Sequence, residues 1–415
     1  MWPKNDELPE FGVLSGVRVL HSTQAQACPF GVSFFADYGA DVIWLESALT
    51  PDVRRAMPSR TVEADSRNQR DLALNIPSEE GRKIFLDLIE DADIFIECSK
   101  GGTYDKWGLT DEVMWERNPA LVILHESGFG QTGIESYVKR PCFDSIAQAY
   151  SSYMDNNRNP VTAPYPVGPY AADFICGLYV AVSCLAALYR AKTTGEGESI
   201  DLAEFESTFR TQQYQSDWLT DHVQMNRAGD PEAMAGIATV RCKDDRYIQT
   251  SLTGARATKC ACELFGLPYG TEEIPEGIGL LYMNTPGGQK YRKAMEEYCL
   301  SHDAEDVQRV FNENHLPCQI VYTMEDLEND PHAQERGLFA SWKNLRGEEI
   351  RAARSVPVFK KHPNQIWRGA PWWGYDNEDI LKKMGYDEED IKRLYDDKVI
   401  AKDAEGDLVY PWKNR

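Results

Sequence analysis

The sequence predicts an α/β protein with a Rossmann-like large domain, built on a parallel sheet, and a smaller α+β domain. Residues 17–125 alternate short β-type runs with amphipathic helical runs, which is typical of βαβ units. After about residue 225 a hairpin-like pair and Gly/Pro-rich connections replace this alternation. The 415 residues are enough for two or three domains. We expect residues 1–222 to begin the large domain, 223–335 to form the small domain, and 336–415 to return to the large domain.

The first half of the chain supplies the strands and helices of the expected sheet. Runs of Val, Ile and Leu predict strands, and Ser or Thr ahead of apolar residues three or four apart predicts a capped helix. The expected strands are Val17–Leu20, Asp41–Leu45, Ile94–Ile96 and Leu121–His125. The expected helices are Gly31–Tyr38, one that follows Ser78 and buries Ile84, Phe85, Leu88 and Ile89, and a short one that follows Thr110.

The second half begins with a long apolar helix. It starts at Asp173, within PYAADFICGLY (169–179), and runs to about Tyr189. An Asp just before an apolar helix is typical of an N-cap. The further expected elements are a strand at Ser199–Leu202, a hairpin of Ala238–Cys242 and Tyr247–Leu252, an amphipathic helix at Tyr291–Leu300 and a helical run at Glu388–Tyr395.

Composition and charge exclude several classes of function. The formal net charge of −22 argues against a nucleic-acid partner. No apolar stretch reaches the roughly 18 residues of a membrane-spanning helix, and Met1–Gly12 lacks the features of a signal peptide. We therefore expect a cytoplasmic protein without a membrane partner. The ten cysteines include no CxxC pair and the histidines show no metal-ligand spacing, which predicts reduced thiols and no metal.

The stretch GFGQTG (128–133) satisfies the G-x-G-x-x-G pattern of dinucleotide-binding proteins and follows an expected strand. In those proteins the turn opens directly into a helix whose N-terminus meets the pyrophosphate. Here Pro141 argues against a continuing helix, and no glycine triplet follows the first strand. We interpret the glycines either as a side-chain-free surface at a strand end, where open α/β sheets bind ligands, or as a turn alone.

Six blocks follow one another in the first half of the chain: LSGVRVLHSTQAQACPFG, FADYGADVIWLES, ALNIPSEEGRKIFLDLIEDADIFIECSKGG, NPALVILHESGFGQTG, PYAADFICGLY and TGEGESIDLAEFE. They occur in this order in family III CoA-transferases (CaiB/BaiF type), which the chain resembles. The resemblance extends from about residue 11 to 210, resumes at DPHAQERG and ends with IWRGAPWWGYDNEDILKKMGYDEEDI. It is greatest to the branch of bile-acid and L-carnitine CoA-transferases, in SKGG, NPALVI, NDPHAQERG and IWRGAP.

The resemblance implies an enzyme that moves coenzyme A from an acyl-CoA donor to a free carboxylic acid. The family's catalytic Asp matches Asp173, whose carboxylate attacks the thioester to give a mixed anhydride and then an aspartyl-CoA thioester. The helix N-terminus would hold this carboxylate ionised, so the roles of cap and nucleophile are compatible. Gln26 and Asp144 match positions of supporting residues, and Asp144 is equally well explained as the cap of a helix that begins near Ser145.

Coenzyme A enters as an acyl-CoA co-substrate, with no tightly bound cofactor. Lys100 and Lys106 match basic coenzyme A contacts of the family, and Asn75 lies in the block whose backbone brackets the adenine. Gly128, Gly130 and the Thr253–Gly254 turn are candidate oxyanion donors. The stretch Arg54–Arg70 has five arginines and two acids, and we interpret it as a partly solvated loop that offers arginines to the 3′-phosphate.

The family also implies an interlocked homodimer. The acyl group is expected to be bile-acid-like or carnitine/betaine-like, with a pocket shaped by residues 210–290. Two alternatives stay open: an acyl-CoA racemase or epimerase of the same fold, which needs an acid/base pair around the acyl α-carbon, and a non-catalytic coenzyme A-binding homologue.

Overall fold

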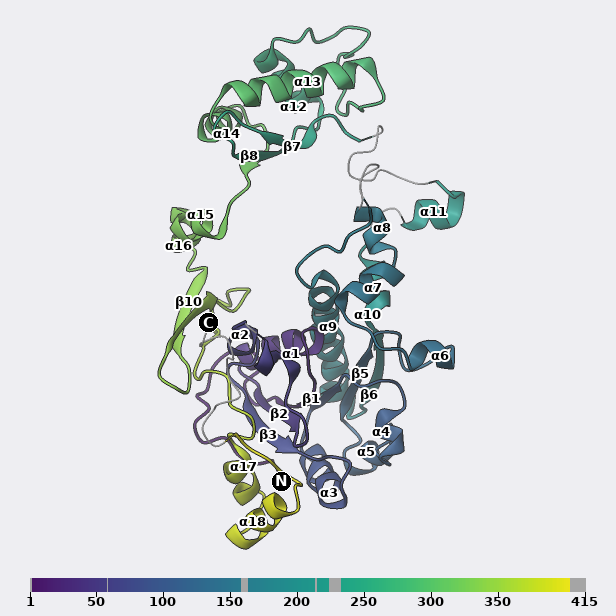
Figure 1. Cartoon of the computed structure of the whole chain (residues 1–415), viewed down its shortest axis with the longest axis vertical. Coiled ribbons are helices and arrows are strands. Elements are labelled where there is room, and N and C mark those ends of the chain that lie inside the picture. The colour runs from purple at the N-terminus through teal and green to yellow at the C-terminus, as the bar shows by residue number, and fades with distance from the viewer. Residues whose placement is uncertain (1, 58, 158–162, 213–214, 224–232, 404–415) are drawn as a thin grey trace. The chain divides into compact units, whose positions relative to one another are not determined.

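The computed structural model describes residues 2–57, 59–157, 163–212, 215–223 and 233–403 (Figure 1). It divides the chain into two compact units, of which unit 1 comprises Met1–Tyr153, Pro166–Gln212 and Gly337–Arg415. Unit 2 comprises Met154–Tyr165 and Gln213–Arg336. Residues 224–232 of the expected small domain, and 404–415 of the expected C-terminal segment, lie outside the described residues.

A six-stranded parallel sheet forms the centre of unit 1, in the order β3-β2-β1-β4-β5-β6. Its strands are β1 (Arg18–Ser22), β2 (Asp41–Ser47), β3 (Arg70–Leu74), β4 (Ile94–Glu97), β5 (Val122–Ser127) and β6 (Glu198–Ala203). The predicted parallel sheet is therefore confirmed. The strand order reverses between β1 and β4, and open sheets of this kind bind ligands at the carboxyl ends of the strands beside that point.

The helices of unit 1 cover the sheet (Figure 1). Ser78 and Thr110 cap α3 and α5 as predicted, because each side chain accepts a hydrogen bond from a backbone N–H three residues on. The helices are α1 (Ala27–Asp37), η1 (Val53–Ala56), α2 (Thr61–Asp65), α3 (Glu79–Ile89), α4 (Thr103–Lys106), α5 (Asp111–Arg117), α6 (Glu135–Val138), α7 (Asp144–Tyr150), α9 (Ala171–Thr194), α10 (Glu204–Arg210), α17 (Asn377–Lys383) and α18 (Glu388–Asp396).

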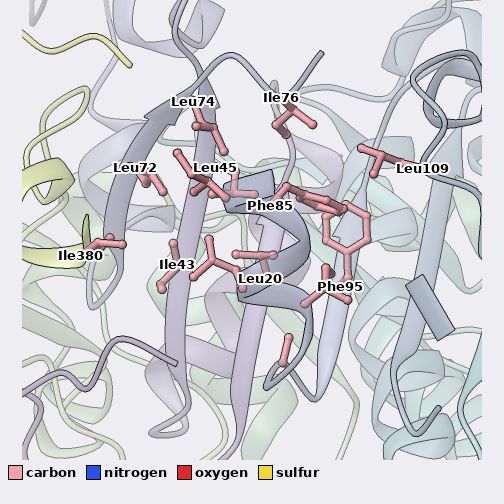
Figure 2. Packing of buried hydrophobic residues seen from close by; sticks show 14 of the residues in the cluster. Leu20, Ile43, Leu45, Leu72, Leu74, Ile76, Phe85, Phe95, Leu109 and Ile380 are labelled. Atoms are coloured by element: carbon pink, nitrogen blue, oxygen red, sulfur yellow. The ribbon is translucent and has the colours of Figure 1, made fainter. Parts of the chain in front are cut away.

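Alternate residues of the strands enter two separate cores. On one face Leu20, Ile43 and Phe95 pack with α3, α17 and α18 (Figure 2). On the other face Val19 and Val42 pack with α1 and α9. This period of two is what a sheet buried on both faces requires, and each core fixes one layer of helices.

Helices α1 and α9 cross at a pair of glycines. A Cβ on Gly177 would lie 2.6 Å from the carbonyl oxygen of Ala27, and one on Gly31 would lie 2.6 Å from the carbonyl oxygen of Gly177. Because the two backbones touch, only glycine fits here. The crossing lies one helical turn after Asp173 and so fixes the position of that residue.

Helix α9 is long and apolar enough to cross a membrane by length and composition, so the prediction that no stretch reaches such a length was wrong. Its buried residues, such as Val180, Cys184 and Leu188, pack in the core formed with α1 and the sheet. A core helix of this kind passes the same length test.

The C-terminal segment covers the edge of the parallel sheet. The backbone N–H groups of Asp71 and Ala73 on β3 donate to Asp376 and Asn377 at 2.8 and 3.0 Å. An exposed edge strand is a site of unwanted pairing, and these bonds close it. An antiparallel pair, β10 (Phe339–Lys343) and β11 (Glu349–Ala353), precedes this segment.

Unit 2 has its own antiparallel sheet, β7-β8-β9, and its own core. The predicted hairpin is confirmed by the pairing of β7 with β8, and α13 contains the predicted amphipathic helix. Its strands are β7 (Ile237–Arg241), β8 (Tyr247–Ser251) and β9 (Cys318–Ile320). Its helices are α11 (Gln215–Asp221), α12 (Ala255–Phe265), α13 (Pro286–Ser301), α14 (Ala304–Glu313), α15 (Met324–Asn329) and α16 (Pro331–Glu335), and α8 (Tyr153–Asn157) begins at the boundary.

Candidate active site

Asp173 lies in the first turn of α9, half-buried, at the third helical position. The N-cap residue is Tyr170, so the prediction that Asp173 caps the helix was wrong. Asp144 supplies the cap instead: its Oδ1 accepts hydrogen bonds from the backbone N–H groups of Ala172 at 2.8 Å and of Asp173 at 3.5 Å. The Asp173 side chain is therefore not used in capping its own helix.

Asp144 was predicted either as a supporting residue of the site or as the cap of its own helix. It is the first residue of α7, whose N-cap is Phe143, so it does not cap that helix. Its second oxygen accepts a hydrogen bond from Gln148 at 2.8 Å, and Gln148 also pairs with the backbone of Val167 at 2.8 and 3.0 Å. Asp144 and Gln148 thus hold the start of α9 from a neighbouring helix.

Two further acids surround Asp173. Glu126 lies on β5 and Glu204 is the first residue of α10, directly after β6; both are buried. The carboxyl groups of Asp173 and Glu204 lie within reach of each other, so a hydrogen bond joins them when one of the two is protonated. We name Glu126, Asp144, Asp173 and Glu204 the acid cluster.

Burial and mutual repulsion raise the pKa values of three members of the acid cluster. Burial, followed by the charge of Asp144, raises the pKa of Asp173 to about 7, whereas the hydrogen bond from Glu204 acts in the opposite direction. Burial and the charges of Glu126 and Asp173 raise the pKa of Glu204 to about 10. Burial and the charge of Asp173 raise the pKa of Glu126 to about 8. The helix N-terminus was expected to hold Asp173 ionised, and burial and the charge of Asp144 act against that effect.

Two buried thiols contact one member of the acid cluster. Cys28 and Cys176 lie against the two oxygens of Glu126, with Sγ to Oε2 at 3.7 Å and Sγ to Oε1 at 3.9 Å. Burial raises the pKa of both thiols well above its usual value. They are therefore neutral, weak donors and poor nucleophiles.

The glycine-rich turn that follows β5 contacts residues that neighbour Asp144 and Glu204 in the sequence. A Cβ on Gly128 would lie 1.9 Å from the Cβ of Cys142, and the carbonyl oxygen of Gly128 accepts from the N–H of Phe205 at 3.4 Å. Gly130 has a φ of +82°, and the next N–H, of Gln131, donates to Asp201 at 2.8 Å. The predicted coenzyme A-binding roles of Gly128 and Gly130 stay predictions, but the turn has a packing requirement of its own.

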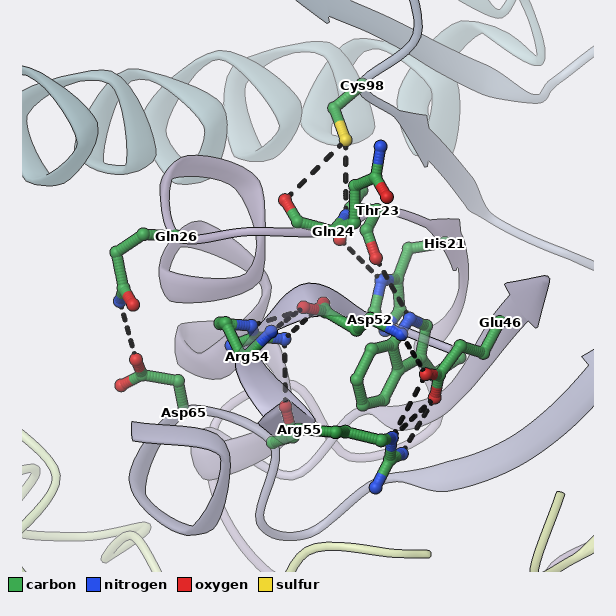
Figure 3. A network of polar contacts seen from close by, with 12 residues as sticks. His21, Thr23, Gln24, Gln26, Glu46, Asp52, Arg54, Arg55, Asp65 and Cys98 are labelled. Carbon is green, nitrogen blue, oxygen red and sulfur yellow. Dashed lines mark hydrogen bonds and ion pairs between the residues drawn. The ribbon is translucent and has the colours of Figure 1, made fainter. Parts of the chain in front are cut away.

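Gln26 forms a different contact from the predicted one. Its amide Nε2 donates to Asp65 Oδ2 at 2.6 Å (Figure 3). Within the described ranges, no hydrogen bond joins Gln26 to Asp173, and the role of Gln26 at the nucleophile stays a prediction.

The stretch Arg54–Arg70 is not a solvated loop, because four of its arginines are buried. Arg54 pairs with Asp52 at 3.1 Å and Arg55 with Glu46 at 2.7 Å (Figure 3). The other two buried pairs are Arg67 with Asp37 and Arg70 with Asp41. The acids that pair with these arginines lie outside the stretch. The charges within the stretch alone therefore predicted a solvated loop instead of buried ion pairs.

The predicted coenzyme A contacts come after strands β3 and β4, on the side of the sheet where the strands have their carboxyl ends. Asn75 follows β3, Lys100 follows β4 and Lys106 ends α4; both lysines are exposed. The Asn75 backbone is already bonded, its N–H to Val399 and its carbonyl oxygen to Ser78. The loop of Lys100 packs on the glycine-rich turn, because a Cβ on Gly101 would lie 3.2 Å from the carbonyl oxygen of Gln131.

The analysis of the sequence missed Glu126 and Glu204. Glu126 stands near the carboxyl end of β5, Glu204 directly follows β6, and the two strands are parallel neighbours. Acids in that position on two adjacent strands are the signal that could have placed both at the ligand-binding edge. In the part of the chain that the structure describes, no group of three or more His, Cys, Asp or Glu side chains is arranged to hold a metal ion.

Comparison with known proteins identifies matches over most of the chain. A family model described as CoA-transferase family III matches residues 14–377. A crystal structure of a CaiB/BaiF family protein from Brucella suis has a TM-score of 0.76 and 24% identity, over 90% of this chain and 100% of that one. Rv3272 from Mycobacterium tuberculosis, in an orthorhombic crystal form, has a TM-score of 0.75 and 20% identity, over 90% and 99%. At these identities the two structures support the fold, and they confirm the predicted α/β class.

Proposed function

The chain belongs to CoA-transferase family III, and from this premise we propose that it transfers coenzyme A from an acyl-CoA donor to a free carboxylic acid with Asp173 as the nucleophile. One observation carries the proposal. Asp173 stands half-exposed at the helix start with its capping role taken over by Asp144, so its carboxylate is available to a substrate.

The environment of Asp173 suits nucleophilic attack. A pKa raised to about 7 leaves much of the carboxylate ionised at neutral pH and makes it more basic than an ordinary Asp. Attack on the thioester carbonyl forms a C–O bond and breaks the C–S bond, which gives a mixed anhydride and a CoA thiolate. Because this step removes the charge from Asp173, it relieves the repulsion among the acids.

The remaining steps return the enzyme to its starting state. The thiolate attacks the aspartyl carbonyl of the anhydride and releases the first acid, leaving an aspartyl-CoA thioester. The acceptor acid attacks this thioester, and the released thiolate then attacks the acyl carbonyl of the new anhydride. The products are a new acyl-CoA and free Asp173, so the thioester bond energy is retained throughout.

We assign coenzyme A binding to the carboxyl ends of the parallel strands in unit 1. The exposed ammonium groups of Lys100 and Lys106 would supply positive charge for the phosphates in an otherwise acidic protein. Asn75 and the backbone of Gly128 and Gly130 follow strands at the same edge. The acyl group is bile-acid-like or carnitine/betaine-like in this proposal.

The racemase alternative has less support. Racemisation needs an acid and a base on opposite faces of one substrate carbon, whereas the carboxyl groups of Asp173 and Glu204 lie within hydrogen-bonding reach of each other. This pair cannot bracket a carbon atom in the arrangement described.

Kinetics of Asp173 variants test the function. Asp173→Asn should lower kcat for transfer by about 10⁴-fold or more, the scale of losing a nucleophile, while calorimetry shows coenzyme A binding within a few-fold of wild type. Transfer at near wild-type rate by Asp173→Asn would contradict the proposal. Loss of coenzyme A binding in a double Lys100→Ala, Lys106→Ala variant with an unchanged thermal unfolding curve would support the binding assignment.

A further inference from the structure

Glu204 is a buried acid that interacts with Asp173, and it takes no part in the reaction steps described above. The residue is 4% exposed, and its carboxyl group lies within hydrogen-bonding reach of Asp173 and beside the thiol of Cys142. Its Oε1 is buried without a hydrogen-bond donor from the described residues. An ionised carboxylate with such an oxygen would carry an uncompensated buried charge.

The charged groups that act on Glu204 are acids on three different elements. They are Glu126 on β5, Asp173 on α9 and Asp144 on α7, with the neutral thiols of Cys142 and Cys176 between them. Two carboxylates cannot hydrogen-bond to each other unless one of them holds a proton. Glu204 is the more deeply buried of the two, and its Oε1 has no hydrogen-bond partner among the described residues, so burial favours a proton on Glu204.

We propose that Glu204 is a positioning residue that stays a neutral carboxylic acid and donates the hydrogen bond that orients the Asp173 carboxylate. This bond occupies one oxygen of Asp173 and leaves the other to attack, so the nucleophilic oxygen is selected. The catalytic part of this inference rests on the proposed function, whereas the protonation of Glu204 does not.

The proton balance of the first step follows. Asp173 forms a C–O bond with the acyl carbon, the C–S electron pair leaves with the thiolate, and the proton stays on Glu204. The pair then changes from one negative charge to none. The repulsion between Asp173 and the other acids is thereby relieved, whereas the hydrogen bond from Glu204 weakens, because it stabilises the carboxylate more than the acylated state.

Infrared spectroscopy tests the protonation directly. At pH 8 the difference spectrum between wild type and Glu204→Gln should contain the carbonyl band of a protonated carboxyl group. The matched control Glu206→Gln, two residues further on the same helix but exposed, should lose a carboxylate band only. The Glu126→Gln variant identifies the band of the other buried acid. If Glu204→Gln also lost only a carboxylate band, the proposal would be overturned whether or not the protein transfers coenzyme A.

Kinetics separate positioning from folding. Glu204→Gln keeps a donor and should keep kcat within about 10-fold of wild type, whereas Glu204→Ala should lower kcat by roughly 10- to 100-fold with KM for acyl-CoA unchanged, as loss of a bond to a charged group implies. Thermal unfolding of both variants checks the fold. Equal losses in the Gln and Ala variants, both folded, would overturn the positioning role.

Discussion

Asp173 is subject to two opposing influences. The start of α9 favours its ionised form through the helix dipole, whereas burial and the charge of Asp144 favour the protonated form and raise the pKa to about 7. Burial dominates because Asp144 occupies the N–H groups that would otherwise stabilise the Asp173 carboxylate. A nucleophile with a pKa near neutrality is the result.

The transfer rate should therefore depend on pH. Only the carboxylate of Asp173 can attack, so kcat should rise with pH through a value near 7. Asp144→Asn removes a charge that raises the Asp173 pKa but retains an oxygen that can cap α9. The pH at which kcat rises, the acidic limb of the pH profile, should therefore be lower in this variant. Pre-steady-state rates from pH 5 to 9 measure this shift, with Glu206→Gln as the control. A limb that stays in place in Asp144→Asn would contradict the electrostatic account.

The same raised pKa has a cost in stability. In the unfolded chain Asp173 ionises near the ordinary Asp value of 3.8, but in the folded chain near 7. Between these values the folded state binds more protons, so wild-type stability should fall as pH rises from about 4 to about 7. Asp173→Asn should raise the free energy of unfolding by about 2–4 kcal/mol at pH 8 and by almost nothing below pH 4. Urea denaturation at both pH values measures the difference, and an equal effect at both would exclude this origin.

Predictability differs among the residues of the site. The resemblance of PYAADFICGLY singled out Asp173, but the capping role failed because the competing cap, Asp144, lies 29 positions away in the sequence. Glu126 and Glu204 become neighbours of Asp173 only when β5, β6 and α9 are assembled. Sequence spacing carries no information about such contacts.

At the scale of elements, local signals were sufficient for the strands and capped helices. Ser78 and Thr110 cap α3 and α5 because both the donor and the acceptor lie within four residues. The glycines at 31 and 177 carry no such local signal, since the requirement comes from the other helix. The Arg54–Arg70 stretch was misinterpreted because three of its partner acids lie on α1 and β2, and the fourth, Asp52, lies just before the stretch at the N-cap of η1.

The α1–α9 crossing should be sensitive to one methyl group. Gly177→Ala places a Cβ against the backbone of Ala27 and should destabilise the protein by about 1–3 kcal/mol, as overpacking of a core does. Thermal or urea unfolding measures the loss. The control is Gly168→Ala, since a Cβ there would meet nothing within 4 Å. Equal effects of the two substitutions would show that the close approach is not the cause.

At the scale of the whole molecule, the homodimer predicted from the family resemblance stays a prediction, as does the cytoplasmic location. Exposed apolar side chains on one face of α9 favour burial by a second copy: Leu178, Val182 and Tyr189 are 50%, 65% and 75% exposed. Size-exclusion chromatography with in-line light scattering should give the mass of two chains. The Val182→Glu variant should form the dimer more weakly than wild type. A wild-type mass of one chain at micromolar concentration would contradict this expectation.

The most direct test of the central claim is intact-protein mass spectrometry after incubation with acyl-CoA donors. The account predicts a coenzyme A-sized adduct that maps to the peptide containing Asp173, is converted by hydroxylamine to a hydroxamate at that residue, and is absent in Asp173→Asn. An adduct on a different residue, or turnover by wild type together with an equally active Asp173→Asn variant, would contradict it.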